Sequence, residues 1–141
     1  MKMDYFDYEY RVRYADTDKL GVSYYANYLV WFEAARTEYF RFLGFPYTEC
    51  EKKGCFLPVV EAKAHYFSPS TYDDLLLIRT SVSHMGRSSI RFEYQVMNKA
   101  TKKLLASGYT VHVFVDRDLK PTRIPEEVKE IVSPFSLLKE K

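Results

Sequence analysis

Two aspartates separated by one threonine stand just ahead of the longest helical pattern in the chain. Asp16 and Asp18 are followed by a glycine-containing loop, residues 19–23, and then by that helix. The free N–H groups of a helix start, together with the positive end of the helix dipole, can hold a developing oxyanion. A carboxylate beside them could act on an acyl group as a general base or as a nucleophile. The alternative is that either aspartate only shapes the loop, as aspartates often do.

Other candidate catalytic groups have less support. No serine or cysteine stands in a nucleophile-elbow motif beside one of the three histidines, His65, His84 and His112. Cys50 and Cys55 lack CxxC spacing and a neighbouring histidine. We interpret them as ordinary thiols and expect no metal site and no cofactor. Glu33 and Arg36 are three residues apart on the helical pattern, so we expect them to pair across one turn and stabilise the helix.

The aspartates must be positioned by a strand on one side and a long helix on the other. Apolar and charged residues alternate from Tyr5 to Tyr14, which predicts a strand with one buried face. From Tyr28 to Leu43 apolar residues recur at spacings of three and four, which predicts an amphipathic helix. We expect a polar entry to this helix at Ser23 or Asn27, and an end at Gly44.

After the helix the period of two returns and continues through most of the chain. Four more strands are predicted, followed by a short helix: Pro58–Phe67, Leu75–His84, Ser89–Asn98, Lys103–Val115 and the helix Glu126–Ile131. The turns between these strands are short, which predicts antiparallel neighbours. The predicted fold is a single α+β domain over residues 1–141, with an antiparallel sheet of about five strands wrapped around one long central helix.

Composition and charge exclude several classes of protein. The 141 residues carry 21 Lys and Arg against 19 Asp and Glu, and the resulting charge of +2 is too small to indicate nucleic acid as a main partner. A hydrophobic content of 47% excludes intrinsic disorder. No apolar run approaches the roughly 18 residues that span a bilayer, and no signal-peptide pattern opens the chain, so we expect a cytoplasmic protein. The 13 tyrosines suit contact surfaces, which predicts a homo-oligomer.

The loop and the helix resemble a known family. The strings DTDKLGV (residues 16–22), YYANY (24–28) and EAAR (33–36) resemble the 4-hydroxybenzoyl-CoA thioesterase-like branch of the hotdog-fold superfamily, and are most similar to the acyl-CoA thioesterases associated with the bacterial Tol-Pal system. The likeness extends to PVVEA (58–62), YDDL (72–75) and GRSS (86–89). It implies a hotdog fold and hydrolysis of an acyl-CoA to free acid and CoA.

The resemblance also implies roles for particular residues. Asp18 would be the catalytic carboxylate, as general base or nucleophile, and the backbone N–H near Tyr25 would polarise the thioester carbonyl. One common form of the pattern has histidine where Tyr25 stands. Acyl-CoA would bind at a subunit interface of a homodimer or homotetramer, with its phosphates near the hairpin that carries Arg87 and Ser88.

Two alternative functions stay open. A non-catalytic acyl-thioester-binding or scaffold protein would keep the fold and use Asp18 only to shape the loop. An enoyl-thioester hydratase or dehydratase has less support, because that chemistry pairs a histidine with a carboxylate and no histidine precedes His65. The sequence leaves the acyl group open, aromatic or aliphatic and of any length.

Overall fold

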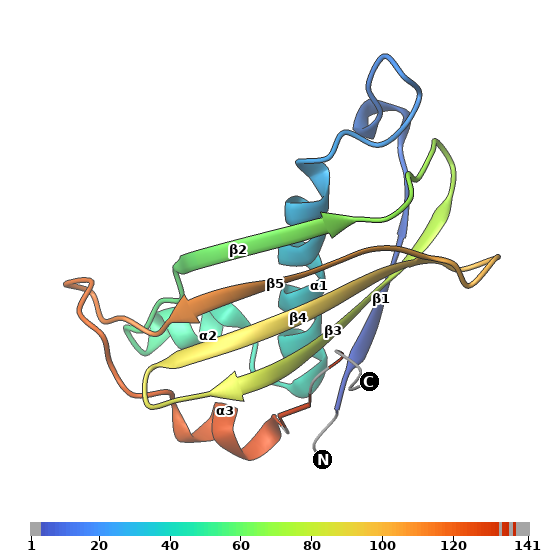
Figure 1. Ribbon diagram of the computed structural model, residues 1–141. Coiled ribbons are helices and arrows are strands. Elements are labelled where there is room, and N and C mark those ends of the chain that lie inside the picture. The colour runs from blue at the N-terminus through green and yellow to red at the C-terminus, as the bar shows by residue number, and fades with distance from the viewer. Residues whose placement is uncertain (1–3, 133, 136, 138–141) are drawn as a thin grey trace.

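A curved antiparallel sheet wraps around one long helix in the computed structural model (Figure 1). The structure describes residues 4–132, 134, 135 and 137. The strands are β1 (Phe6–Arg11), β2 (Val59–Tyr66), β3 (Leu75–Met85), β4 (Ser89–Asn98) and β5 (Leu104–Val113). The helices are α1 (Asn27–Leu43), α2 (Tyr47–Lys52) and α3 (Glu126–Ile131), with a short 3-10 turn at Tyr14–Asp16. The predicted α+β architecture, with one central helix, is confirmed.

The order of the strands in the sheet is β1-β3-β4-β5-β2, and every neighbouring pair is antiparallel. Strand β2 therefore lies at one edge beside β5, and β3 lies beside β1 and β4. The expectation that the turn at residues 68–70 joins neighbouring strands is wrong. Ser70 in this link is fully buried and is anchored to Ser23 by a backbone bond of 2.8 Å and a hydroxyl bond of 2.6 Å, so the link crosses the helix start.

The core lies between α1 and the concave face of the sheet. Phe32 of α1 stacks on Tyr94 of β4 with ring centroids 4.2 Å apart and planes within 3°. Gly108 of β5 allows this approach, because a Cβ there would lie 2.3 Å from the Lys63 carbonyl oxygen and 2.7 Å from the Phe32 ring. Trp31 packs on Tyr10 of β1 at 5.2 Å. The apolar stripe of α1 thus contacts the central strands and one edge strand.

The segment after α1 differs from the sequence expectation. Helix α2 was not predicted, because six residues are too few to display a helical period. Cys50 in α2 and Cys55 form a disulfide with their Cα atoms 5.2 Å apart, so the interpretation of ordinary thiols is wrong. The chain turns back between them at Gly54, whose φ of 80° is a conformation that glycine adopts readily. Among the described residues, no helix is long and apolar enough to cross a membrane.

The predicted ion pair within α1 is also absent from the described residues. Glu33 instead accepts a hydrogen bond from the Thr37 hydroxyl at 3.2 Å. Arg36 turns toward the sheet and donates to the Tyr94 hydroxyl at 3.4 Å. The reason is that Arg36 lies on the buried side of the helix, whereas Glu33 stays exposed to water.

Candidate active site

Helix α1 begins without a side-chain cap. Ala26 occupies the N-cap position, and no side chain in the described part of the chain caps the first turn. The expected polar entry is therefore wrong, because the Ser23 hydroxyl bonds to Ser70 and the Asn27 amide donates to the Asp16 carbonyl oxygen. The backbone N–H groups of Tyr25 and Ala26 donate to no acceptor in the described part of the chain. Two donors at the positive end of the helix dipole are thus available to a ligand.

The loop ahead of this helix start holds Asp18 in a tight turn. Asp18 N–H donates to the Val22 carbonyl oxygen, and Gly21 N–H donates to the Asp18 carbonyl oxygen, each at 2.9 Å. Gly21 has a φ of 83°, which most residues avoid. One carboxylate oxygen of Asp18 accepts the Leu20 N–H at 2.8 Å. The other accepts no hydrogen bond from the described residues, and the side chain is exposed, so this oxygen is free to act as a base or nucleophile.

Asp16, the first aspartate of the pair, is used differently. Its carboxylate accepts hydrogen bonds from the Tyr10 hydroxyl at 2.6 Å and from the Arg13 N–H at 2.8 Å. Burial, and then this carboxylate, raise the pKa of Tyr10 to about 12, so the hydroxyl stays a donor. The Asp16 backbone also receives the Asn27 amide at 2.8 Å. Asp16 therefore fastens the loop to β1 and α1, and Asp18 remains available for chemistry.

An open, mainly aromatic cavity of about 270 Å³ lies beside the helix start. It is lined by Ser23, Tyr25, Tyr28, Tyr66, Phe67, Ser68 and Pro69. The Tyr66 hydroxyl donates to the Tyr25 carbonyl oxygen at 3.0 Å, which links β2 to the helix start. The sequence pointed to Tyr25 through its backbone N–H, but it did not single out Tyr66 and Phe67 as site residues. The available signal was the position of Tyr66 on the same strand face as Ala64, which packs against the core.

The other two predicted site residues lie elsewhere. Arg11, the last residue of β1, pairs with Leu75, the first residue of β3. The aspartate loop, which comes after β1 in the chain, therefore lies near the start of β3. Arg87 and Ser88 lie in the hairpin beyond its other end, roughly 33 Å away along the strand at about 3.3 Å per residue. The Arg87 side chain is exposed, and the Ser88 carbonyl oxygen accepts the Phe114 N–H at 2.8 Å. A single chain therefore does not bring the predicted phosphate-binding residues to Asp18.

The chain belongs to the thioesterase-like superfamily, whose family model matches residues 12–132. It is 40% identical to the acyl-CoA thioesterase YbgC of Haemophilus influenzae over 127 residues, which cover 88% of this chain and 91% of that protein. It is 26% identical to the 4-hydroxybenzoyl-CoA thioesterase of a Pseudomonas strain, with 87% and 94% covered.

Solved structures agree with these relatives. The DHNA-CoA thioesterase of Staphylococcus aureus superimposes with a TM-score of 0.83 at 33% identity, covering 91% of this chain and 86% of that one. A gentisyl-coenzyme A thioesterase, BH1999, gives 0.81 at 31% identity, covering 88% and 99%. The hotdog fold and the enzyme class predicted from the loop and helix, a thioester hydrolase, are confirmed.

Proposed function

We propose that the protein hydrolyses the thioester of an acyl-CoA to a free acid and CoA, with Asp18 as the catalytic carboxylate. The observation that carries this assignment is the pairing of a free, exposed Asp18 oxygen with the unused N–H groups of Tyr25 and Ala26 in the same loop-to-helix segment. The names of the relatives, which act on acyl-CoA thioesters, support the same reaction.

The chemistry follows from these groups. The thioester carbonyl oxygen would accept the Tyr25 N–H, so that negative charge developing on this oxygen is stabilised. Asp18 then either takes a proton from a water that attacks the carbonyl carbon, or attacks the carbon itself. The second route gives a mixed anhydride that a water must hydrolyse. In both routes the C–S bond breaks and CoA leaves as a thiolate, and no cofactor is needed.

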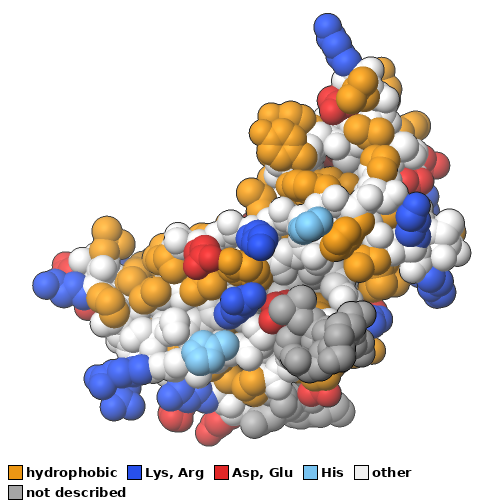
Figure 2. Space-filling model, viewed as in Figure 1, with side chains coloured by type: hydrophobic (Ala, Val, Ile, Leu, Met, Phe, Trp, Pro, Cys, Tyr) orange, Lys and Arg blue, Asp and Glu red, His pale blue; other side chains and the backbone are white. Residues whose placement is uncertain are grey.

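The substrate would lie between two subunits. Strand β2 is an edge strand whose side chains, except Ala64, are exposed. Exposed apolar residues gather on β2, on the segment after it and on the outer side of α1: Val59, Val60, Phe67, Leu29 and Val30. Figure 2 shows one face of the molecule, with hydrophobic side chains near the helix start and a mixture of hydrophobic and charged side chains over β2. Such a surface and a free sheet edge favour a homodimer, or a homotetramer built from dimers, in which a second subunit supplies Arg87 and Ser88 to the CoA phosphates.

The cytoplasm is the proposed location, because acyl-CoA is the proposed substrate. The Cys50–Cys55 disulfide opposes this location, since thiols are usually kept reduced there. Titration of free thiols in protein isolated under alkylating conditions tests it. Two free thiols per chain are expected for a cytoplasmic protein, and none would contradict that location.

The deciding experiment is release of free thiol from short, long and aromatic acyl-CoAs. Asp18→Asn keeps the shape of the side chain and removes the basic oxygen, so turnover should fall about a thousandfold. Asp118→Asn is the matched control, because Asp118 is also exposed in a loop but lies in the distant segment after β5. Retained turnover in a folded Asp18→Asn protein would reject the mechanism. Binding of CoA without release of thiol from any substrate would favour a non-catalytic binding protein.

A further inference from the structure

A buried cation in the second half of α1, Arg36, has no carboxylate partner among the described residues. Arg36 is 9% exposed. Its guanidinium donates one long hydrogen bond, at 3.4 Å, to the neutral Tyr94 hydroxyl, and no described carboxylate oxygen lies within 4.0 Å of it. Removing a charge from water is unfavourable unless a counter-charge replaces the water. This guanidinium is therefore placed to receive an anion from outside the chain.

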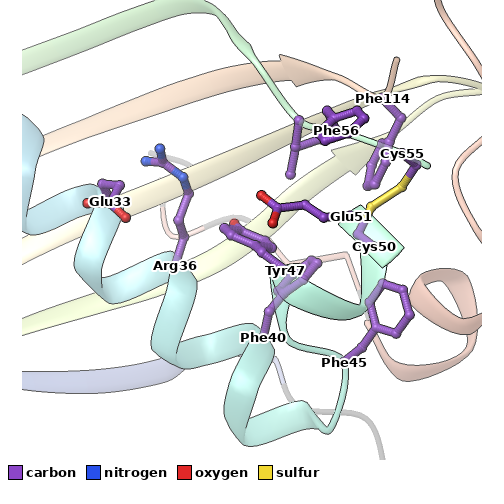
Figure 3. Close-up of a pocket in the computed structure, with 11 residues that line it drawn as sticks. Glu33, Arg36, Phe40, Phe45, Tyr47, Cys50, Glu51, Cys55, Phe56 and Phe114 are labelled. Carbon is purple, nitrogen blue, oxygen red and sulfur yellow. A yellow bond between two sulfur atoms is a disulfide. The ribbon is translucent and has the colours of Figure 1, made fainter. Parts of the chain in front are cut away.

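Arg36 lines a cavity of about 180 Å³ between α1, α2 and the chain around β5 (Figure 3). Its walls are formed by aromatic rings and the disulfide: Phe40, Phe45, Phe56, Phe114, and Cys50 with Cys55. The hydroxyl of Tyr47, which also lines the cavity, is buried and has no hydrogen-bond partner among the described residues. The cavity thus combines an apolar interior with a guanidinium whose hydrogen bond to Tyr94 is long and a Tyr47 hydroxyl without a described partner.

Two carboxylates limit the kind of anion that this cavity can take. Glu33 and Glu51 also line it, and both side chains are exposed (Figure 3). Water and salt screen exposed charges strongly, whereas the buried guanidinium is screened much less. A ligand with one negative charge is therefore attracted by Arg36 more than it is repelled by the two glutamates. A dianion such as phosphate would bring a second charge out of water into a lining that offers one cation, Arg36.

We propose that this cavity binds a small aromatic carboxylic acid as its monoanion, with the carboxylate on Arg36 and the ring among the phenylalanines. Arginine pairs with carboxylates through two parallel hydrogen bonds, which suits a planar anion. A cavity of about 150 Å³ is large enough to hold a benzene ring. The Tyr47 hydroxyl would donate to the second side of the carboxylate.

This cavity is separate from the thioester site. Arg36 lies nine residues after Asn27, about 14 Å along the axis of α1. No residue that lines the cavity beside Tyr25 also lines the Arg36 cavity. The inference therefore does not depend on the chemistry assigned to Asp18. The Asp18→Asn protein should bind the acid as the wild type does.

The test is calorimetric titration of the whole protein with benzoate and with benzamide, its neutral analogue. We expect saturable binding of benzoate at least tenfold tighter than that of benzamide, because only benzoate pairs with the guanidinium. Phthalate, a dianion, should bind more weakly than benzoate. Equal affinities for benzoate and benzamide, or no saturable binding of benzoate, would overturn the proposal.

Variants locate the site. Arg36→Met keeps the length and apolar stem of the side chain and should raise the Kd of benzoate at least tenfold. Arg41→Met is the matched control, since Arg41 lies on the same helix but is exposed and paired with Glu38, and its Kd should stay within about twofold. If Arg36→Met does not fold, Tyr47→Phe decides, with an expected rise of about threefold in the Kd of benzoate and none for benzamide. An unchanged Kd in the variant used would reject this site.

Discussion

The two ends of α1 carry polar groups in opposite settings. At the N-terminal end, Asp18 is exposed and two backbone N–H groups have no acceptor among the described residues. In the C-terminal half Arg36 is buried, and so is His112 of β5. The dipole of the helix favours negative charge at its start, and there the backbone itself provides the donors. Farther along the helix the dipole no longer favours an anion, so binding of an anion there requires a buried cationic side chain.

This difference has a chemical reason. Hydrolysis needs water, so the reacting carboxylate must stay accessible to it. A charged ligand binds more tightly where water is excluded, because electrostatic interactions are stronger in a low dielectric. The proposed reaction site and the proposed binding site thus differ in exposure as well as in their positions along the helix.

The largest expected effect tests the backbone donor at the helix start. Tyr25→Pro removes the N–H, and Tyr25→Ala removes only the ring, so the two variants separate the contributions. Tyr25 is the second residue of the turn closed by the Asn27 N–H and the Tyr24 carbonyl oxygen, a position that accepts proline. We expect kcat for an acyl-CoA to fall about 100-fold to 1000-fold further in Tyr25→Pro than in Tyr25→Ala.

Circular dichroism and thermal unfolding provide the control for that pair, because both variants must remain folded for the comparison to hold. Equal kcat values in two folded variants would remove the Tyr25 N–H from the mechanism. Of the groups proposed here near the N-terminal end of α1, the Asp18 carboxylate would then be the one that keeps a role in the reaction.

The second prediction concerns the buried His112 and the dependence of protein stability on pH. Burial lowers the pKa of His112 from 6.5 to about 4, and its ring nitrogens contact the Thr110 hydroxyl at 2.8 Å and the Leu57 carbonyl oxygen at 3.1 Å. Below pH 6.5 the unfolded chain takes up a proton that the folded protein refuses until about pH 4. Stability is therefore lost as pH falls through this window. From pH 7 to pH 4.5 the loss should be about 2.5 kcal/mol.

Urea unfolding at the two pH values measures this loss. His112→Gln should remove the His112 part of the pH dependence, although the variant itself is less stable. His65→Gln is the matched control, because it makes the same substitution at an exposed position of β2. The same slope in wild type and in His112→Gln would mean that His112 is not kept neutral by burial.

A smaller effect is expected from the disulfide in the wall of the Arg36 cavity. Cys50 and Cys55 are five residues apart, and closing so short a loop stabilises a protein by about 2 kcal/mol. Replacing both by serine should lower the free energy of unfolding by that amount relative to wild-type protein in which the disulfide has formed, as measured by urea unfolding without reductant. Adding a reductant should lower the stability of the wild type similarly and leave the double variant unchanged. Turnover of acyl-CoA should not change, since the disulfide lies at the opposite end of α1 from Asp18.

Much of the fold could be predicted from the sequence, because strands and helices follow from the spacing of apolar residues. The alternation in β4 and the spacing of three and four in α1 gave elements within one residue of the structure, since each buries one face. The order of the strands could not be read in this way. The link at Ser70 looks like a hairpin turn, but its burial against Ser23 is a contact between segments 47 residues apart.

The candidate site likewise has features that the local sequence shows and features that depend on residues distant in the chain. The position of Asp18 before a helix is local, so the sequence located it. The distinction between Asp16 and Asp18 depends on the Tyr10 hydroxyl, which comes from a different element. The buried setting of Arg36 depends on α2, which has too few residues to show a pattern. Groups defined by a neighbour distant in sequence were missed for this reason.

The smallest expected effect tests whether the hairpin far from Asp18 joins the proposed reaction site through a second subunit. Arg87→Gln should raise KM for an acyl-CoA about tenfold, the effect of losing one charge-assisted contact to phosphate, with kcat nearly unchanged. For the same acyl group on N-acetylcysteamine, which has no phosphates, KM should not change. Lys52→Gln, an exposed cation of α2 paired with Glu49, is the control and should alter neither value. Equal rises in KM for both substrates would show that Arg87 acts on the fold of the hairpin and not on the phosphates, and the two ends of the molecule would then be independent.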